Sequence, residues 1–167
     1  MSIGPLDLSN ANTSGFEAVD AGKYDAAVAE MSWDQVKNEG GKTPVGTPML
    51  KVRFKLLRNL AGDTDGIEGK SVFASYVVPP KDYDPKKAAI MQGMIANLFI
   101  GLGDNEEDVK SKKFEPDFQD YIERECIVTV GREPKKDQTG SIIEGEYNNP
   151  VKGVRPTGSV TAASGLL

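Results

Sequence analysis

Residues 49–57 read MLKVRFKLL and carry the clearest alternation in the 167-residue chain. Two kinds of residue occupy alternate positions: apolar Leu50, Val52, Phe54 and Leu56, and cationic Lys51, Arg53 and Lys55. Successive side chains of a β-strand point to opposite faces of its sheet, so this period of two predicts a strand with one buried face and one cationic face. The cationic face is the first candidate for a binding surface.

Four further segments have the pattern of strands. Residues 23–36 change the parity of their apolar positions between Val28 and Met31, so we expect a bend or bulge there. Residues 70–78 end at Pro79-Pro80 and direct Phe73 away from the core if Val72 faces it. Residues 126–130 and 151–154 are short apolar runs that complete the set.

The segments between these strands differ in character. Residues 85–102 have apolar positions at spacings of three and four after Pro85, which predicts an amphipathic helix. Residues 104–125 are acidic, and we expect them to be partly helical, with four apolar side chains docking on the core: Phe114, Phe118, Tyr121 and Ile122. Residues 37–48 and 131–149 are rich in Gly, Pro and charged residues and are predicted to be loops.

Three antiparallel strands, a helix and two further strands form the element order of the OB-fold, a five-stranded Greek-key barrel with its helix between strands three and four. We expect this mainly β fold over residues 21–155, between a mobile N-terminal segment, 1–20, and a flexible C-terminal tail, 156–167, which are both small and polar. An open α+β sheet of the same elements is the alternative. The length of the first strand favours the barrel, because barrel closure needs a strand that bends between two sheet halves.

Composition argues against most kinds of enzyme. The chain has no His and one Cys, which removes the commonest general base, the commonest zinc ligand and every Ser-His or Cys-His nucleophile. We therefore predict a protein that is not an enzyme and holds neither metal nor cofactor.

No apolar run approaches the roughly 20 residues of a membrane span, so we expect no membrane partner. The net charge of −5 is accounted for by residues 104–125, which leaves a neutral remainder.

OB-folds bind oligonucleotides across strands two and three, between the loops that follow strands one and four. Cations occupy three of these four places: Lys51, Arg53 and Lys55 on strand two, Lys37 and Lys42 after strand one, and Arg132, Lys135 and Lys136 after strand four. Cations neutralise phosphates and flat rings stack on unpaired bases, so Phe73, Trp33 and Tyr147 are the stacking candidates. The alternative is structural: charges often form the solvated face of a strand, and Trp33 could cap the barrel.

Five segments carry a family resemblance: 21–24, 49–55, 69–73, 126–131 and 149–153. Together they resemble small bacteriophage proteins that bind single-stranded DNA through an OB-fold. The resemblance implies non-catalytic, sequence-tolerant binding of single-stranded DNA during phage DNA replication or recombination, in the cytoplasm of a bacterial host. It implies replication and recombination proteins of phage or host as further partners, and it allows a homo-oligomer.

The end of the chain differs from many proteins of this kind, which recruit replication partners through an acidic tail. This chain ends Ser164-Gly165-Leu166-Leu167, so we expect no such recruitment. The alternative function is a phage protein-interaction module, an adaptor or host-takeover factor that uses the same barrel, with residues 104–125 as its contact surface. A virion structural component is a third and weaker hypothesis.

Overall fold

The computed structural model describes residues 4–7, 9, 18–37, 44–62, 64 and 66–157. Lys42, most of the segment 1–20 and residues 158–167 of the predicted tail lie outside the described residues. The statements below concern the described part of the chain.

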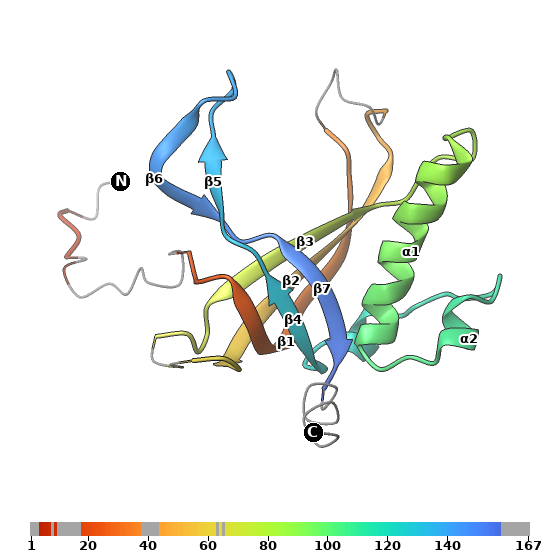
Figure 1. The fold of residues 1–167 in the computed structure, drawn as a ribbon, viewed down its shortest axis with the longest axis horizontal. Helices are drawn as coiled ribbons and strands as arrows, with labels where there is room; N and C mark the ends of the chain where they lie inside the picture. The colour runs from red at the N-terminus through yellow and green to blue at the C-terminus, as the bar shows by residue number, and fades with distance from the viewer. Residues whose placement is uncertain are drawn as a thin grey trace.

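The predicted mainly β fold with one main helix is confirmed (Figure 1). All five predicted strands are present, as β1 (Gly22–Gln35), β2 (Pro48–Asn59), β3 (Ser71–Val77), β4 (Glu125–Val130) and β7 (Val151–Pro156). They form one antiparallel sheet in the order β3-β2-β1-β4-β7. The helix α1 (Pro85–Gly101) follows β3 and packs on β7.

The expected barrel closure is wrong, because the five-stranded sheet is open and does not form a hydrogen-bonded barrel. Strands β3 and β7 are its two edges, and neither is hydrogen-bonded to the other. Helix α1 lies at this opening, where Tyr76 of β3, Leu98 of α1 and Val154 of β7 line one groove. The helix packs against both edges, which approach each other without a backbone ladder.

The expected irregularity of the first strand is confirmed. The register of β1 against β2 shifts between Asp25 and Ala26 and again between Val28 and Glu30. An extra residue in one strand changes which face the following side chains occupy. As a result both Val28 and Met31 are buried in the core, and Glu30 opposes Arg53 on the other face.

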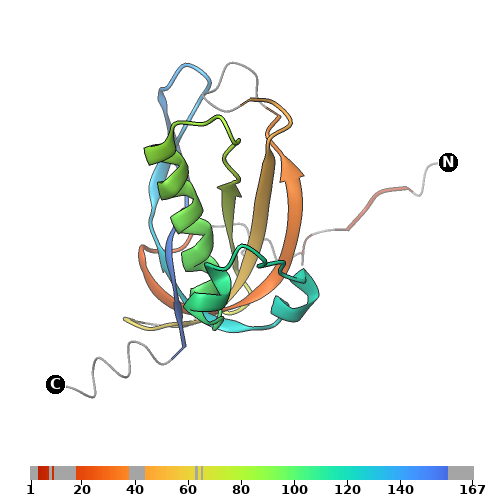
Figure 2. The same ribbon diagram turned by 90° about the vertical axis from the view of Figure 1, so that its right-hand side faces the viewer.

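The prediction of a loop over residues 131–149 is wrong. This segment forms a two-stranded hairpin of β5 (Glu133–Lys136) and β6 (Ile142–Asn148). Its turn is organised by Asp137, whose carboxylate accepts hydrogen bonds from the N–H groups of Thr139 at 2.8 Å and Ser141 at 3.1 Å. Neither strand contains a fully buried residue, so the hairpin lacks the apolar pattern that identifies a strand in a sequence. The hairpin and the distal ends of β1 and β2 rise on the same side of the molecule (Figures 1 and 2).

Helix α1 is anchored at both ends. Asp84 caps its first turn by accepting a hydrogen bond from the N–H of Lys87 at 3.2 Å. At its last turn, a Cβ added to Gly101 would lie 2.5 Å from the carbonyl oxygen of Val154, so only glycine allows this approach to β7. The first half of the helix is exposed, including Ile90 and Met94. Among the described residues, no helix is long and apolar enough to cross a membrane.

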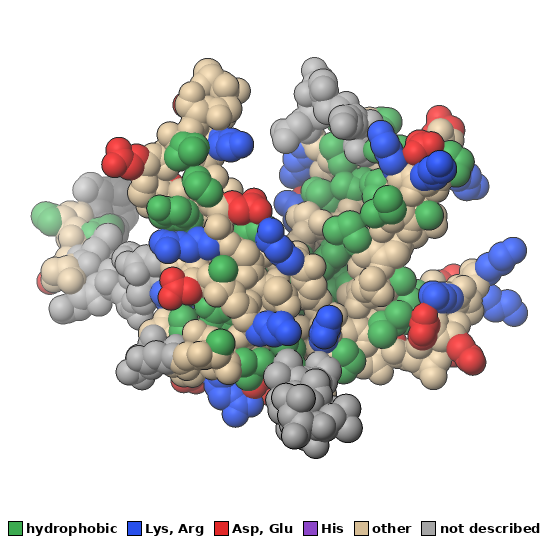
Figure 3. Space-filling model, in the orientation of Figure 1, with side chains coloured by type: hydrophobic (Ala, Val, Ile, Leu, Met, Phe, Trp, Pro, Cys, Tyr) green, Lys and Arg blue, Asp and Glu red, His purple; other side chains and the backbone are tan. Residues whose placement is uncertain are grey.

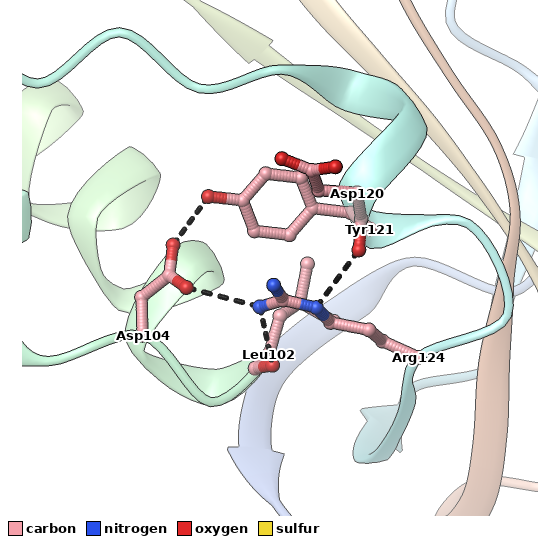
Figure 4. A network of polar contacts seen from close by, with 5 residues as sticks. All are labelled: Leu102, Asp104, Asp120, Tyr121 and Arg124. Atoms are coloured by element: carbon pink, nitrogen blue, oxygen red, sulfur yellow. Dashed lines mark hydrogen bonds and ion pairs between the residues drawn. The ribbon is translucent and has the colours of Figure 1, made fainter.

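The acidic segment is fixed to the body as predicted. It contains the short helix α2 (Glu106–Val109) and the 3-10 helix η2 (Phe118–Tyr121), and its four predicted apolar residues are buried or pack against the core. Arg124 ties the segment together (Figure 4): it binds the Asp104 carboxylate at 2.9 Å, donates to the Asp120 carbonyl at 3.0 Å and lies over the Tyr121 ring. The Tyr121 hydroxyl donates to Asp104, and burial, followed by this bond, raises the pKa of Tyr121.

Candidate nucleic-acid interface

The outer face of β1, β2 and β3 carries the predicted cations and one predicted ring. Arg53 of β2 opposes Glu30 on one side and Phe73 on the other. Directly opposed residues of an antiparallel pair lie on the same face of a sheet, so these three side chains share the outer face. Phe73 is 65% exposed, which confirms its expected outward direction. Lys51 and Lys55 occupy the same face, because they alternate with the buried residues of β2.

A hollow of about 750 Å³ joins this face to the hairpin. Its lining includes Arg53 of β2, Phe73 of β3, and Lys135 and Tyr147 of the hairpin, together with the acidic residue Glu133. Four of the predicted site residues, distant in sequence, are therefore brought together around one concavity. Two exposed rings and two cations are the side chains that could contact a base and a phosphate of a bound strand.

The base of the hairpin is held by one amide. The Asn149 Oδ1 accepts a hydrogen bond from the Val19 N–H, and its Nδ2 donates to the carbonyls of Val19 and Gly131, all at 2.9 Å. These bonds join the segment before β1, the end of β4 and the connection between β6 and β7. Asn149 thereby sets the position of the hairpin that carries Lys135 and Tyr147.

The hairpin cations differ in their contacts. The Arg132 guanidinium lies over the Tyr147 ring, 4.1 Å from its centroid, and 3.8 Å from the Asp20 carboxylate. Lys135 and Lys136 are exposed and form no ion pair with any described residue. Lys135 faces the hollow, whereas Lys136, the next residue along the strand, does not line it.

The β2 cations are all paired with carboxylates. Lys51 Nζ lies 2.8 Å from Asp34, Arg53 Nη2 lies 2.9 Å from Glu30, and Lys55 Nζ lies 2.6 Å from Glu123, in three ion pairs. The hydrogen bond from Lys51, with one from the Gln35 N–H, lowers the pKa of Asp34 to about 2. The cationic stripe expected from the sequence is thus a row of ion pairs. On the face drawn in Figure 3, Lys and Arg side chains are likewise interspersed with Asp and Glu.

Lys51, Lys55, Arg132 and Lys136 do not line the hollow, and Trp33 and Lys37 lie apart from it as well. Trp33 opposes Leu50, which is fully buried, so its side chain is on the opposite face of the sheet from Phe73. The Trp33 ring is 58% exposed and lies 5.3 Å from the ring of Phe118. Lys37 is paired with Asp34 at 3.6 Å, beyond the end of β1.

Sequence reasoning missed the three carboxylates of this face. Glu30 and Asp34 carried a usable signal, since they alternate with Met31 and Trp33 in a strand expected to pair with β2. Glu123 carried none. It reaches Lys55 from a turn in which its own φ is 71°, a left-handed conformation that is uncommon for any residue but glycine.

Other chemistry is sparse in the described part of the chain. No group of three or more His, Cys, Asp or Glu side chains there could hold a metal ion. Cys126 is fully buried, as expected of a small apolar residue, and burial raises the pKa of its thiol to about 12.

The sequence matches no protein-family model and no curated protein sequence. Function is therefore inferred from the residues and their placement.

Proposed function

We propose that this chain is a non-catalytic, sequence-tolerant binding protein for single-stranded DNA that acts in phage DNA replication or recombination. The observation that carries the proposal is the hollow shared by Arg53, Phe73, Lys135 and Tyr147. Exposed rings beside unburied cations are the combination that binds unpaired bases and their phosphates together. The structural alternative, in which Phe73 points into the core, does not fit a side chain that is 65% exposed.

We further propose that the architecture is a partly open OB-fold. Three features support it: the strand order β3-β2-β1-β4-β7, the helix between β3 and β4, and a long insertion between β4 and β7. In that fold the outer edges of the order, here β3 and β7, face each other, and nucleic acid lies over strands two and three. The hairpin β5–β6 would then be the second of the two loops that flank the bound strand.

The chemistry of the hollow fits a sequence-tolerant ligand. Each base stacked on an aromatic ring contributes about 1–3 kcal/mol, and every base offers a flat face. Phe73 and Tyr147 supply two such rings, with 65% and 38% of their surface exposed. Arg53 and Lys135 lie beside them and would contact the phosphates that connect the stacked bases.

A protein-interaction module is the second candidate, and one observation favours it. Ile90 and Met94 of α1 are 66% and 53% exposed, and the acidic segment contacts the same helix. Under this hypothesis, reversing charges within residues 104–125 abolishes function, while the double variant Lys51→Glu, Arg53→Glu is tolerated.

Binding of labelled oligo-dT at two salt concentrations tests the proposal. Phe73→Ala is expected to weaken binding by about 5- to 150-fold, the equivalent of one lost stack. Ile90→Ala is the matched control, because Ile90 is as exposed as Phe73 but lies on α1. Wild-type affinity should fall as salt rises, since phosphate contacts release counterions. Equal effects of the two substitutions, or no binding by the wild type at low salt, would refute the proposal.

A further inference from the structure

The ion pairs on β2 place a carboxylate beside each of the three predicted phosphate-binding cations of that strand. Glu30 and Asp34 come from β1, and Glu123 comes from the turn after η2. The Glu30 and Glu123 side chains are 69% and 65% exposed, so both can move away from their partners without disturbing the core. The Glu30 and Glu123 carboxylates can thus be exchanged for another anion, whereas the Asp34 side chain is only 25% exposed.

The position of Glu123 is set by the backbone. Its N–H donates to the Val28 carbonyl at 2.8 Å, and the Val28 N–H donates to the Arg124 carbonyl at 3.0 Å. These two bonds attach the turn to the bulge of β1 and hold Glu123 at its left-handed φ of 71°. The carboxylate therefore reaches Lys55 from a fixed point, and both of its oxygens accept from that ammonium.

We infer that Glu30 and Glu123 are internal competitors for the phosphate sites at Arg53 and Lys55, and that they weaken the binding of every strand that reaches these cations. This inference rests on the proposed binding of single-stranded DNA. A phosphate that binds Arg53 replaces one carboxylate by another anion and gains little. A strand that reaches both cations displaces a carboxylate at each of them, so its binding is weakened at each paired site.

The same competition changes the salt dependence of binding. A phosphate bound to a cation releases the counterions condensed around it, with a slope of about −0.7 per phosphate on a single strand. Each displaced carboxylate then attracts a cation from solution, which offsets part of that release. The observed slope should therefore be shallower than the number of contacting cations implies, and removal of a carboxylate should steepen it.

The test compares Glu30→Gln with Glu107→Gln. Both variants remove one negative charge, but Glu107 is on α2 and forms no ion pair with a described residue. Binding is measured with one labelled oligo-dT of about 4 nucleotides and one of about 16, the limits of the site size of a single OB-fold. Equal melting temperatures of the two variants establish that both are folded.

We expect Glu30→Gln to tighten binding by about 1.4- to 5-fold relative to Glu107→Gln, the equivalent of one exposed ion pair. The gain should appear with both strands, because each displaces the same carboxylate from Arg53, and the salt slope should become steeper. Binding by Glu30→Gln that is equal to or weaker than that of Glu107→Gln overturns the inference while leaving the proposed function in place. Absence of binding by the wild type and both variants at low salt overturns the proposed function itself.

Discussion

The Asn149→Asp substitution tests whether one amide positions the hairpin. Aspartate keeps the oxygen that accepts from the Val19 N–H, but it replaces the amide nitrogen that donates to the Val19 and Gly131 carbonyls. Two hydrogen bonds are lost, each with a net contribution of about 0.5–1.5 kcal/mol. The free energy of unfolding should fall by about 1–3 kcal/mol, and by more where the new charge meets the two carbonyls. For a chain of this length that corresponds to a melting temperature lower by about 2–12 °C.

The control for this prediction is Asn148→Asp. Asn148 is exposed, lines the hollow and makes no side-chain hydrogen bond with a described residue, so the variant adds the same charge without breaking the clamp. Thermal unfolding measures the stability of both variants. Asn149→Asp should melt lower than Asn148→Asp; their binding is not compared, because a charge at Asn148 would itself repel phosphates from the hollow. Equal melting temperatures would refute the reasoning, because they would show that the amide does not hold the base of the hairpin.

Three further predictions concern packing and ionisation. Gly101→Ala should lower the free energy of unfolding by about 1–3 kcal/mol, because the added Cβ meets the backbone of β7. Gly93→Ala on the same helix meets no atom and should raise the free energy of unfolding by about 0.5–1 kcal/mol. Chemical denaturation measures both, and equal effects of the two substitutions would contradict the packing of Gly101 on β7. The Cys126 thiol, with its pKa raised to about 12 by burial, should resist alkylation at pH 8 until the protein unfolds, and rapid labelling of the native protein would be inconsistent with its burial. The pKa of Asp34 should be about 2 by NMR and should return toward its ordinary 3.8 in Lys51→Ala. Because folding lowers this pKa, the contribution of Asp34 to stability is present above pH 3.8 and is lost as the pH falls toward 2. An unchanged pKa in the variant would show that the ion pair does not form in solution.

The sequence predicted the five strands and the helix because each carries an apolar pattern tied to burial. Leu50, Val52 and Phe54 are all buried, and Leu98 and Leu102 are buried at the helical spacing of four. The hairpin β5–β6 was not predictable in this way. Its strands bury no side chain fully and depend on backbone pairing and on the turn at Asp137, which leave no periodic trace in the residue types.

The candidate site was predictable in part. The period of two placed Arg53 and Phe73 on the outer face correctly, because the buried residues of each strand fix its register. Trp33 was harder to place, since a bulge of one residue decides which face it occupies. The pairing of Lys55 was not predictable, because it depends on Glu123, which only the three-dimensional structure brings to that cation.

Ultraviolet crosslinking of oligo-dT to the wild-type protein, followed by mass spectrometry of the crosslinked peptides, tests most directly whether one face binds the strand. The account predicts crosslinks at Phe73 and Tyr147, the two rings that line the hollow, and none in residues 104–125. Crosslinks confined to α1 or to the acidic segment, with neither ring modified, would contradict it.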